Sequence, residues 1–257
     1  MGSRQGDFIW YELMTPDMDA ARSFYEAVAG WKVDTESQYQ DKDYRFIRWG
    51  EDQLGGMLGM TDDMIAHGAK PLWIAYIAVD DVDQMAATIE AKGGHLFIRP
   101  SDIPGVGRFA MCADPQGAPF YIMNDTSGAT STAFADNQVG HWGWNELWVP
   151  DTKAAVDFYC GLFGWEQQGA MPMGPRGDYL FLEHEGQRIG AIGPVRDPAK
   201  GAYWRHVFRV PSIDKALQAA KAHGATDIEG PHQVPGDDHV MYAKDPQGAT
   251  FVLVGGK

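Results

Sequence analysis

Two glutamates are the polar residues of this sequence that are best placed for chemistry. Glu12 and Glu146 each lie in an apolar, aromatic segment, and each follows a tryptophan, Trp10 or Trp144, by two residues. Side chains alternate between the faces of a strand, so each carboxylate shares a face with its indole. On a cavity wall, desolvation would raise the pKa of the carboxyl group and suit it to acid or base catalysis, or to binding a ligand amine. The alternative is a structural glutamate, hydrogen-bonded to a Tyr, a Trp N–H or a backbone N–H.

One histidine joins these glutamates as a candidate catalytic residue. His206 shares a face with Trp204 by the same alternation, whereas the corresponding residue in the first half of the chain is Ala75. Histidine is the commonest proton carrier near neutral pH. We therefore predict catalytic roles for Glu146, His206 and Glu12, with a buried core histidine as the alternative for His206.

Aromatic side chains are predicted to form a ligand-binding surface. Their rings offer large apolar contacts and hold planar or cationic ligands. The predicted ligand-binding residues are Trp10, Trp73, Tyr121, Trp144, Trp148 and Trp204, with Arg108 and His239 at a cavity mouth. Packing in the core is the alternative for these tryptophans, and it is the role we predict for Trp31 and Trp165.

The elements that position these residues are written twice. Residues 12–31 recur at residues 146–165, and 10 of the 20 positions are identical. Such a duplication indicates repeated structural modules. In the first copy, residues 8–14 predict a strand, and an apolar stripe at helical spacing follows. Asp17 suits the helix N-cap and Gly30 suits the residue after the helix.

The remainder of each copy predicts further strands and a second helix. In the first copy we expect strands at residues 44–49, 55–58, 72–79, 109–112 and 119–123, and a helix at about 82–92. The turn Asp114-Pro115-Gln116-Gly117 returns at residues 245–248, and its residue types are those of a β-turn. Residues 99–108 and 230–239 are expected to be long loops.

The predicted architecture is therefore α+β, with each module a βαβββ unit written twice. We expect a first module at residues 1–124, a linker at 125–140 and a second module at 141–257. Whether each module closes on itself or borrows strands from the other stays open, as does the choice between monomer and homodimer.

Charge and composition limit the partners. The formal charge of −14, from 35 acidic and 21 basic residues, argues against a basic face for nucleic acid or an anionic membrane. No apolar run approaches the ~18–20 residues that span a bilayer. Residues 1–6 lack the apolar core of a secretory signal. Cys112 and Cys160 occupy non-equivalent places in the repeat, which excludes a duplicated disulfide framework and favours the cytoplasm.

These motifs resemble the vicinal oxygen chelate superfamily, which includes glyoxalase I, the bleomycin-resistance proteins and the extradiol dioxygenases. The similarity lies in the Pro-Asp exit of the first strand, the Ala-rich helix with Phe-Tyr, the following Gly-Trp and the Asp-Pro-x-Gly hairpin. Both copies carry these motifs, and together they cover nearly the whole chain. The resemblance implies curved mixed sheets that enclose cavities, with helices outside.

The resemblance also implies a divalent metal held by His, Glu or Gln at three kinds of place. These are a position early in the first strand, seven residues before the Asp that starts the helix; the opening of the second-half strand; and a position after the Asp-Pro-x-Gly turn. In this chain the places hold Trp10 and Trp144, Trp73 and Trp204, and Tyr121 and Val252. None is a usual metal ligand, so we expect no metal cofactor.

Our leading hypothesis is a glyoxalase-like protein that binds a small organic molecule, aromatic or cationic, in aromatic-lined cavities. It would act by sequestering the ligand or by metal-free acid/base chemistry. A metal-dependent lyase, isomerase or dioxygenase of the glyoxalase type is the first alternative, with a divalent metal as cofactor at a displaced site. A non-catalytic interaction protein with filled cavities is the second.

Overall fold

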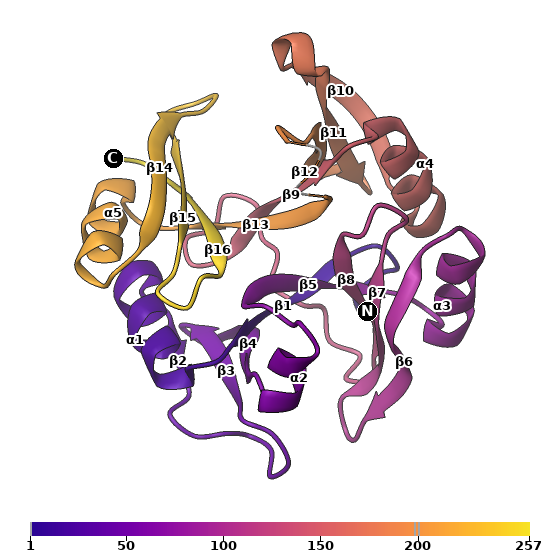
Figure 1. Cartoon of the computed structure of the whole chain (residues 1–257), viewed down its shortest axis with the longest axis horizontal. Coiled ribbons are helices and arrows are strands. Elements are labelled where there is room, and N and C mark those ends of the chain that lie inside the picture. The colour runs from indigo at the N-terminus through magenta and orange to yellow at the C-terminus, as the bar shows by residue number, and fades with distance from the viewer. Residues whose placement is uncertain (1, 198, 200) are drawn as a thin grey trace. The chain divides into compact units, whose positions relative to one another are not determined.

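The computed structural model describes residues 2–197, 199 and 201–257, and its elements follow the predicted duplication (Figure 1). The first module contains β1 (Phe8–Thr15), α1 (Met18–Ala29), β2 (Lys32–Val33), β3 (Tyr44–Trp49), β4 (Asp52–Gly59), α2 (Asp62–Ala66), β5 (Leu72–Ala78), α3 (Val82–Ala91), β6 (His95–Ile103), β7 (Gly107–Ala113) and β8 (Pro119–Asp125). The second contains β9 (Trp142–Val149), α4 (Thr152–Phe163), β10 (Glu166–Pro172), the 3₁₀ turn η1 (Gly174–Arg176), β11 (Asp178–His184), β12 (Gln187–Pro194), β13 (Tyr203–Arg209), α5 (Ile213–Ala222), β14 (Thr226–Gln233), β15 (His239–Lys244) and β16 (Thr250–Gly255). None of the described helices is both long enough and apolar enough to cross a bilayer.

Each module contributes one mixed sheet of eight strands. The strand order is β2-β3-β4-β1-β5-β8-β7-β6 in the first and β10-β11-β12-β9-β13-β16-β15-β14 in the second. β1 and β4 run parallel, whereas β3 and β4 run antiparallel. The predicted α+β class and the tandem repeat of βαβββ units are confirmed.

Local signals in the repeated segment place the first helix of each module. The Asp17 side chain accepts a hydrogen bond from the Ala20 backbone N–H, and α1 ends at Gly30, whose φ is 75°. Asp151 and Gly164 play the same parts for α4. Both predicted helix boundaries are confirmed, because a carboxylate satisfies free N–H groups at one end and glycine adopts the left-handed conformation at the other.

Four strands were missed, β2, β6, β10 and β14, and two of them overlap the stretches predicted as long loops. β6 covers all of residues 99–103, and β14 reaches Gln233, so the loops are shorter than predicted. These four strands form the edges of the two sheets. Edge strands are exposed on one side and tolerate proline, such as Pro100, so they lack the apolar alternation that marks a strand in a sequence.

A glycine repeated in both modules, Gly55 in β4 and Gly190 in β12, marks a close approach of two backbones. A Cβ atom at Gly55 would collide with the Tyr11 carbonyl oxygen, and one at Gly190 would collide with the Asn145 carbonyl oxygen. Glycine therefore lets β4 and β12 lie against the first strand of their module.

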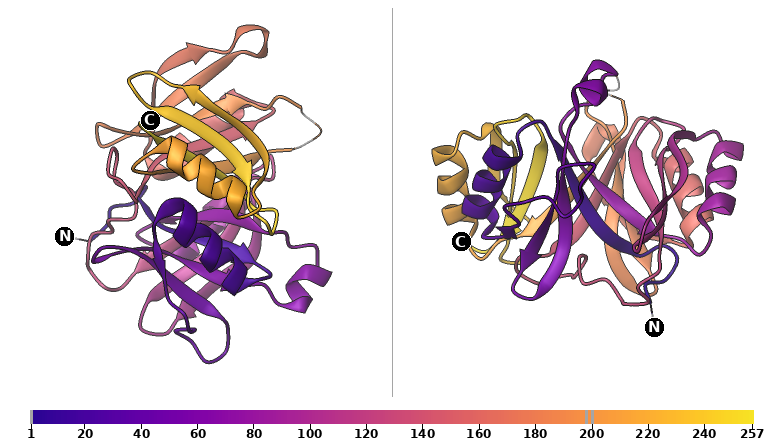
Figure 2. Two further views of the ribbon diagram at one scale, coloured as in Figure 1. Left: turned by 90° about the vertical axis from the view of Figure 1, so that its left-hand side faces the viewer. Right: turned by 90° about the horizontal axis from the view of Figure 1, so that it is seen from below.

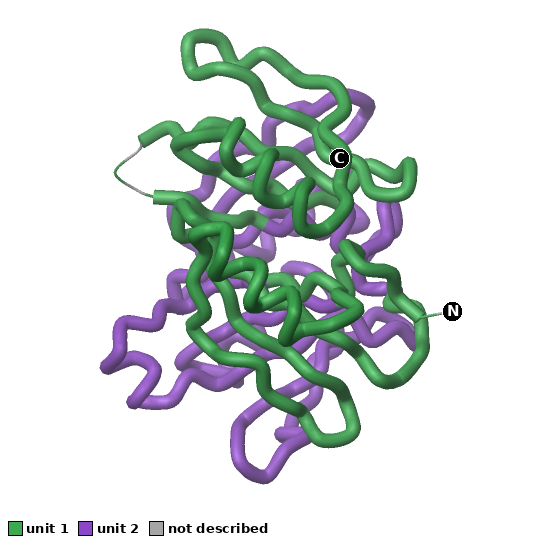
Figure 3. The backbone as a smooth tube through the Cα atoms, turned by 90° about the vertical axis from the view of Figure 1, so that its right-hand side faces the viewer, with its two compact units in different colours: residues 1–9, 75–131, 144–205 green, residues 10–74, 132–143, 206–257 purple. Residues whose placement is uncertain are grey.

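The chain divides into two compact units that do not coincide with the sequence modules (Figure 3). Unit 1 contains Met1–Ile9, Ala75–Ser131 and Trp144–Arg205, and unit 2 contains Trp10–Ile74, Thr132–Gly143 and His206–Lys257. Each unit thus combines the first half of one module with the second half of the other. This settles the question left open by the sequence, because the modules exchange halves.

In unit 2 the exchange is made by α1 and α5, which lie side by side (Figures 1 and 2). The buried Tyr25 hydroxyl donates to Oδ2 of Asp245 at 3.0 Å, although 220 residues separate them in sequence. Burial and the negative charge of Asp245 hold the pKa of Tyr25 well above its usual value. The hydroxyl therefore stays protonated and acts as the hydrogen-bond donor. Asp245 belongs to the second Asp-Pro-Gln-Gly turn.

Unit 1 repeats this contact with the partners reversed. The Tyr159 hydroxyl of α4 donates to Oδ2 of Asp114, in the first Asp-Pro-Gln-Gly turn, at 3.1 Å. Both residues are buried. The repeated turn is therefore more than a chain reversal, because its aspartate receives a tyrosine from the other module.

Candidate functional site

Glu146, on β9, is buried and hydrogen-bonded through both carboxylate oxygens. The Tyr179 hydroxyl donates to Oε1 at 2.9 Å, and the Trp148 indole N–H donates to Oε2 at 3.1 Å. The Trp144 indole N–H donates in turn to the Tyr179 hydroxyl oxygen at 2.8 Å. The carboxylate thus lies among three aromatic side chains. Two of them donate hydrogen bonds to it, and the third donates to the Tyr179 hydroxyl.

A glycine in the neighbouring strand makes room for these rings. β12 pairs with β9 so that Gly193 lies opposite Trp148. A Cβ atom at Gly193 would lie 2.9 Å from an atom of the Trp148 ring and 2.9 Å from one of the Tyr179 ring, closer than real Cβ contacts. A larger residue there would force the two rings away from the carboxylate.

Burial raises the pKa of Glu146 above its ordinary value, while the hydrogen bonds from Tyr179 and Trp148 and the charge of Arg205 lower it in part. Burial raises it because a carboxylate loses solvation when it leaves water. The net shift is upward, which brings the proton exchange of this group closer to neutral pH.

Arg205, on β13, supplies a positive charge to the same face. Its guanidinium carbon lies 5.9 Å from the centroid of the Trp148 ring and 5.2 Å from that of Tyr203. Partly buried apolar side chains surround Trp148 and Tyr179: they are Trp144, Met173, Phe181 and Tyr203. We call Glu146, Trp144, Trp148, Tyr179 and Arg205 the Glu146 cluster; all five belong to unit 1.

Replacing Tyr179 with phenylalanine is expected to raise the pKa of Glu146 further. The hydroxyl donates to the ionised carboxylate and so favours the charged form, and phenylalanine removes that donor. Carboxyl ¹³C chemical shifts of glutamate-labelled protein, followed over pH, give the measurement. Tyr44→Phe, which removes the corresponding hydroxyl in the first module, is the matched control. An equal or lower Glu146 pKa in Tyr179→Phe contradicts the prediction.

The first module carries a related but less polar arrangement. The Trp10 indole N–H donates to the Tyr44 hydroxyl at 2.7 Å, as Trp144 does to Tyr179. Glu12 is buried, with 2% of its surface exposed. The residue that corresponds to Trp148 is Met14, which has no N–H to offer a carboxylate. The catalytic role of Glu12 stays a prediction.

Trp73 and Trp204 lie against helices. The Trp73 indole N–H donates to the Tyr25 hydroxyl of α1 at 2.8 Å, and the Trp204 indole N–H donates to the Tyr159 hydroxyl of α4 at 3.2 Å. Each tryptophan thus extends the Tyr–Asp contact of its unit. These contacts are those of the packing alternative, and ligand binding by either residue stays a prediction.

His206 lies one residue beyond Arg205 and therefore on the other face of β13. Its ring packs edge-on against Tyr11, with 5.2 Å between ring centroids. Burial lowers the pKa of His206 to about 3, because the imidazolium form loses its solvation. The histidine is therefore neutral near pH 7. His206 lies on the same face of β13 as Trp204, as predicted. The residue of β13 that lies over Trp148 is Arg205, not His206.

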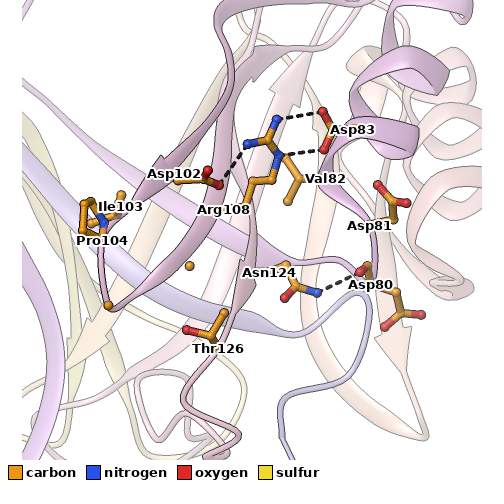
Figure 4. A pocket seen from close by; sticks show the side chains of 12 residues that line it. Asp80, Asp81, Val82, Asp83, Asp102, Ile103, Pro104, Arg108, Asn124 and Thr126 are labelled. Carbon is orange, nitrogen blue, oxygen red and sulfur yellow. Dashed lines mark hydrogen bonds and ion pairs between the residues drawn. The ribbon is translucent and has the colours of Figure 1, made fainter.

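Tyr121 and Arg108 have partners within unit 1. The Tyr121 ring stacks on Tyr76, with 4.2 Å between centroids and 13° between planes. Arg108 donates to both oxygens of Asp83, at 2.6 and 2.8 Å, and to Asp102 at 2.9 Å (Figure 4). Their predicted ligand contacts stay predictions.

Arg108 does line an open pocket of about 390 Å³ between the start of α3 and the β6–β7 hairpin (Figure 4). Asp80, Asp81, Asp83 and Asp102 also line it, so the pocket is acidic even with Arg108 included. His239, its counterpart in the second module, is partly buried at the start of β15, where it pairs with Gly255.

The donor set at the implied metal places does not fit a divalent cation. An indole has only an N–H donor, and valine has no donor atom, so Trp10, Trp144 and Val252 offer no lone pair. Within the described ranges, no three His, Cys, Asp or Glu side chains are grouped so that they could hold a metal ion.

Tyr179 and Arg205 are the members of the cluster that the sequence did not single out. The available signal for Tyr179 was its recurrence with Tyr44 at the start of equivalent strands. For Arg205 the signal was its spacing in the sequence, seven residues before Ser212, the N-cap of α5. The second-half metal place that the resemblance implies is counted from the opening of the strand, so it falls on Trp204, on the opposite face of β13.

Comparisons with known proteins show the relationship. A family model described as the Glyoxalase/Bleomycin resistance protein/Dioxygenase superfamily matches residues 8–122 and 138–253. "Putative glyoxylase CFP32" of Mycobacterium bovis is 40% identical over 118 residues, which are 46% of this chain and 44% of that protein. The match thus spans less than half of the mycobacterial relative.

Two further similarities cover nearly the whole chain. "Anthracycline biosynthesis protein DnrV" of Streptomyces peucetius is 27% identical over 264 residues, 95% of this chain and 91% of that one. The Mn(II)-bound glyoxalase from Novosphingobium aromaticivorans superposes with a TM-score of 0.66 at 18% identity, covering 98% of this chain and 83% of that one. At this identity the structural likeness shows the fold alone.

Proposed function

The chain belongs to the glyoxalase/bleomycin resistance protein/dioxygenase superfamily, and from this premise we propose that it binds a small aromatic molecule at the Glu146 cluster without a metal. The observation that carries the proposal is the buried Glu146 carboxylate, held by Tyr179 and Trp148 in an aromatic setting. Two of its neighbours, Trp144 and Phe181, are only partly buried and offer ring surface to a ligand.

Glu146 is the group that would carry any chemistry. A carboxyl group with a raised pKa can take a proton from a ligand carbon or hydroxyl and return it elsewhere. Tyr179 and Trp148 would hold the carboxylate in one orientation during that exchange. Sequestration needs the same contacts without proton transfer. The Streptomyces relative is named for anthracycline biosynthesis, that is, for the making of a small organic molecule, which supports a ligand of this kind.

Two aromatic probes of equal ring size test the proposal: 2-naphthamide and 2-naphthoate. We expect saturable one-to-one binding to the wild-type protein, measured by isothermal titration calorimetry and tryptophan fluorescence. Trp144→Ala is expected to weaken binding of 2-naphthamide about 10-fold or more, because stacking on an aromatic ring contributes roughly 1–3 kcal/mol. Trp49→Ala, which removes another partly buried indole, in unit 2, is the control and leaves binding unchanged. Failure of both probes to bind contradicts the proposal.

A metal-dependent lyase, isomerase or dioxygenase is the second candidate, favoured by the likeness to a Mn(II)-bound glyoxalase. The same titration separates the two after dialysis against EDTA. We expect binding to survive, and elemental analysis to find no stoichiometric Mn, Fe, Ni or Zn in the untreated protein. Stoichiometric metal whose removal abolishes binding, together with metal-dependent glyoxalase activity, favours the second candidate.

A further inference from the structure

Arg205 occupies a position that the fold repeats four times. The first strand of each half-module carries one residue seven positions before its helix N-cap. These residues are Trp10 before Asp17, Ile74 before Asp81, Trp144 before Asp151 and Arg205 before Ser212. Arg205 is the charged member of this set of four. A cation at one of four equivalent positions is not explained by the repeat of the fold, because apolar residues satisfy the fold at the other three.

The surroundings of Arg205 favour recognition of a flat, negatively charged group. Its guanidinium lies over the faces of Trp148 and Tyr203, which stabilise the positive charge through their ring electrons. A guanidinium that stacks on rings directs its N–H groups along its edge, where they match the two oxygens of a carboxylate. Trp148 also belongs to the cluster against which Trp144 and Phe181 pack, and these two rings are the ones proposed to hold the aromatic ligand.

We propose that Arg205 binds an anionic oxygen of the ligand, a carboxylate, phenolate or enolate, so that the Glu146 cluster selects aromatic acids over neutral aromatic molecules. This inference rests on the proposed function and assigns to it the chemical class of the ligand. Arg205 becomes a specificity-determining residue, and the corresponding Ile74 leaves the first module without this selectivity.

Glu146 is compatible with a neighbouring anion. Its oxygens already accept hydrogen bonds from Tyr179 and Trp148, which offset part of its negative charge. Burial raises its pKa, and a bound anion would raise it further, because a nearby negative charge disfavours the ionised form.

The matched probes test this selectivity, because 2-naphthoate and 2-naphthamide differ in charge but little in shape. We expect the wild-type protein to bind 2-naphthoate about 10-fold tighter or more, as charge-assisted hydrogen bonds are about twice as strong as neutral ones. Arg205→Gln is expected to remove this preference and to leave 2-naphthamide within about 3-fold of its wild-type affinity. Arg205→Lys, which keeps the charge, is expected to retain part of the preference.

Arg99→Gln is the control, since Arg99 is exposed on β6 and its replacement changes the net charge by the same amount. Circular dichroism establishes that each variant is folded. Equal wild-type affinity for the two probes overturns the inference and leaves the proposed function standing, as does a preference that survives in folded Arg205→Gln. If Arg205→Gln does not fold, the control variant still tests the inference. Loss of the preference for 2-naphthoate in Arg99→Gln, or its absence from the wild-type protein, then overturns the inference. Failure of both probes to bind the wild-type protein overturns the proposed function and this inference together.

Discussion

Replacing Trp31 with alanine is expected to lower the free energy of unfolding by about 3–5 kcal/mol, the usual cost of removing a buried tryptophan or phenylalanine. The indole is only 2% exposed. Its ring lies 4.4 Å from Phe208 and 4.9 Å from Trp142, measured between centroids. Its N–H also donates to the Gly140 carbonyl oxygen at 2.7 Å. Alanine would leave a cavity and an unpaired carbonyl in the same place.

Urea denaturation followed by circular dichroism measures this loss. Trp31→Phe, which keeps most of the apolar contact, is expected to lose less than Trp31→Ala. Trp144→Ala serves as the control, because Trp144 is only partly buried and leaves a smaller void. An unfolding midpoint for Trp31→Ala equal to that of Trp144→Ala would show that the aromatic core of unit 2 tolerates the void.

Asp245→Ala is expected to destabilise the protein by roughly 3 kcal/mol or more, because three donors lose their acceptor at about 1–3 kcal/mol each. The carboxylate accepts hydrogen bonds from the Tyr25 hydroxyl and from the backbone N–H groups of Gln247 and Ala249. Asp245 is 1% exposed, so water is poorly placed to replace the lost acceptor. The effect is larger than that of an ordinary turn residue because the Tyr25 contact joins two modules.

The corresponding variant in unit 1 provides an internal test. Asp114→Ala removes the acceptor of the Tyr159 hydroxyl and of two backbone N–H groups, and a similar loss is expected. Asp41→Ala, on an exposed aspartate, is the control and should change the unfolding midpoint little. Chemical denaturation of all three variants under one condition makes the comparison. If Asp245→Ala matches Asp41→Ala, the Tyr25 contact contributes nothing to stability.

The Glu146 cluster was predictable only in part. Alternation along one strand is a local property, so the shared face of Trp144, Glu146 and Trp148 could be deduced from their spacing. Tyr179 comes from another strand, and its contact with Glu146 depends on strand register and on the room that Gly193 leaves. A shift of one residue along β13 decides whether Arg205 or His206 faces Trp148, and a strand's starting point in sequence does not determine that phase.

The sequence by itself determined the duplication, the two helix caps at Asp17 and Gly30, and the strands with apolar alternation, because each of these depends on residues close together in the chain. Only the tertiary structure decided which halves join. The contact between Tyr25 and Asp245 spans 220 residues, and the same motifs would allow either module to close on itself. Edge strands such as β6 also depend on the tertiary structure. Their sequence lacks the apolar alternation of a strand, and pairing with the neighbouring strand provides their hydrogen bonds.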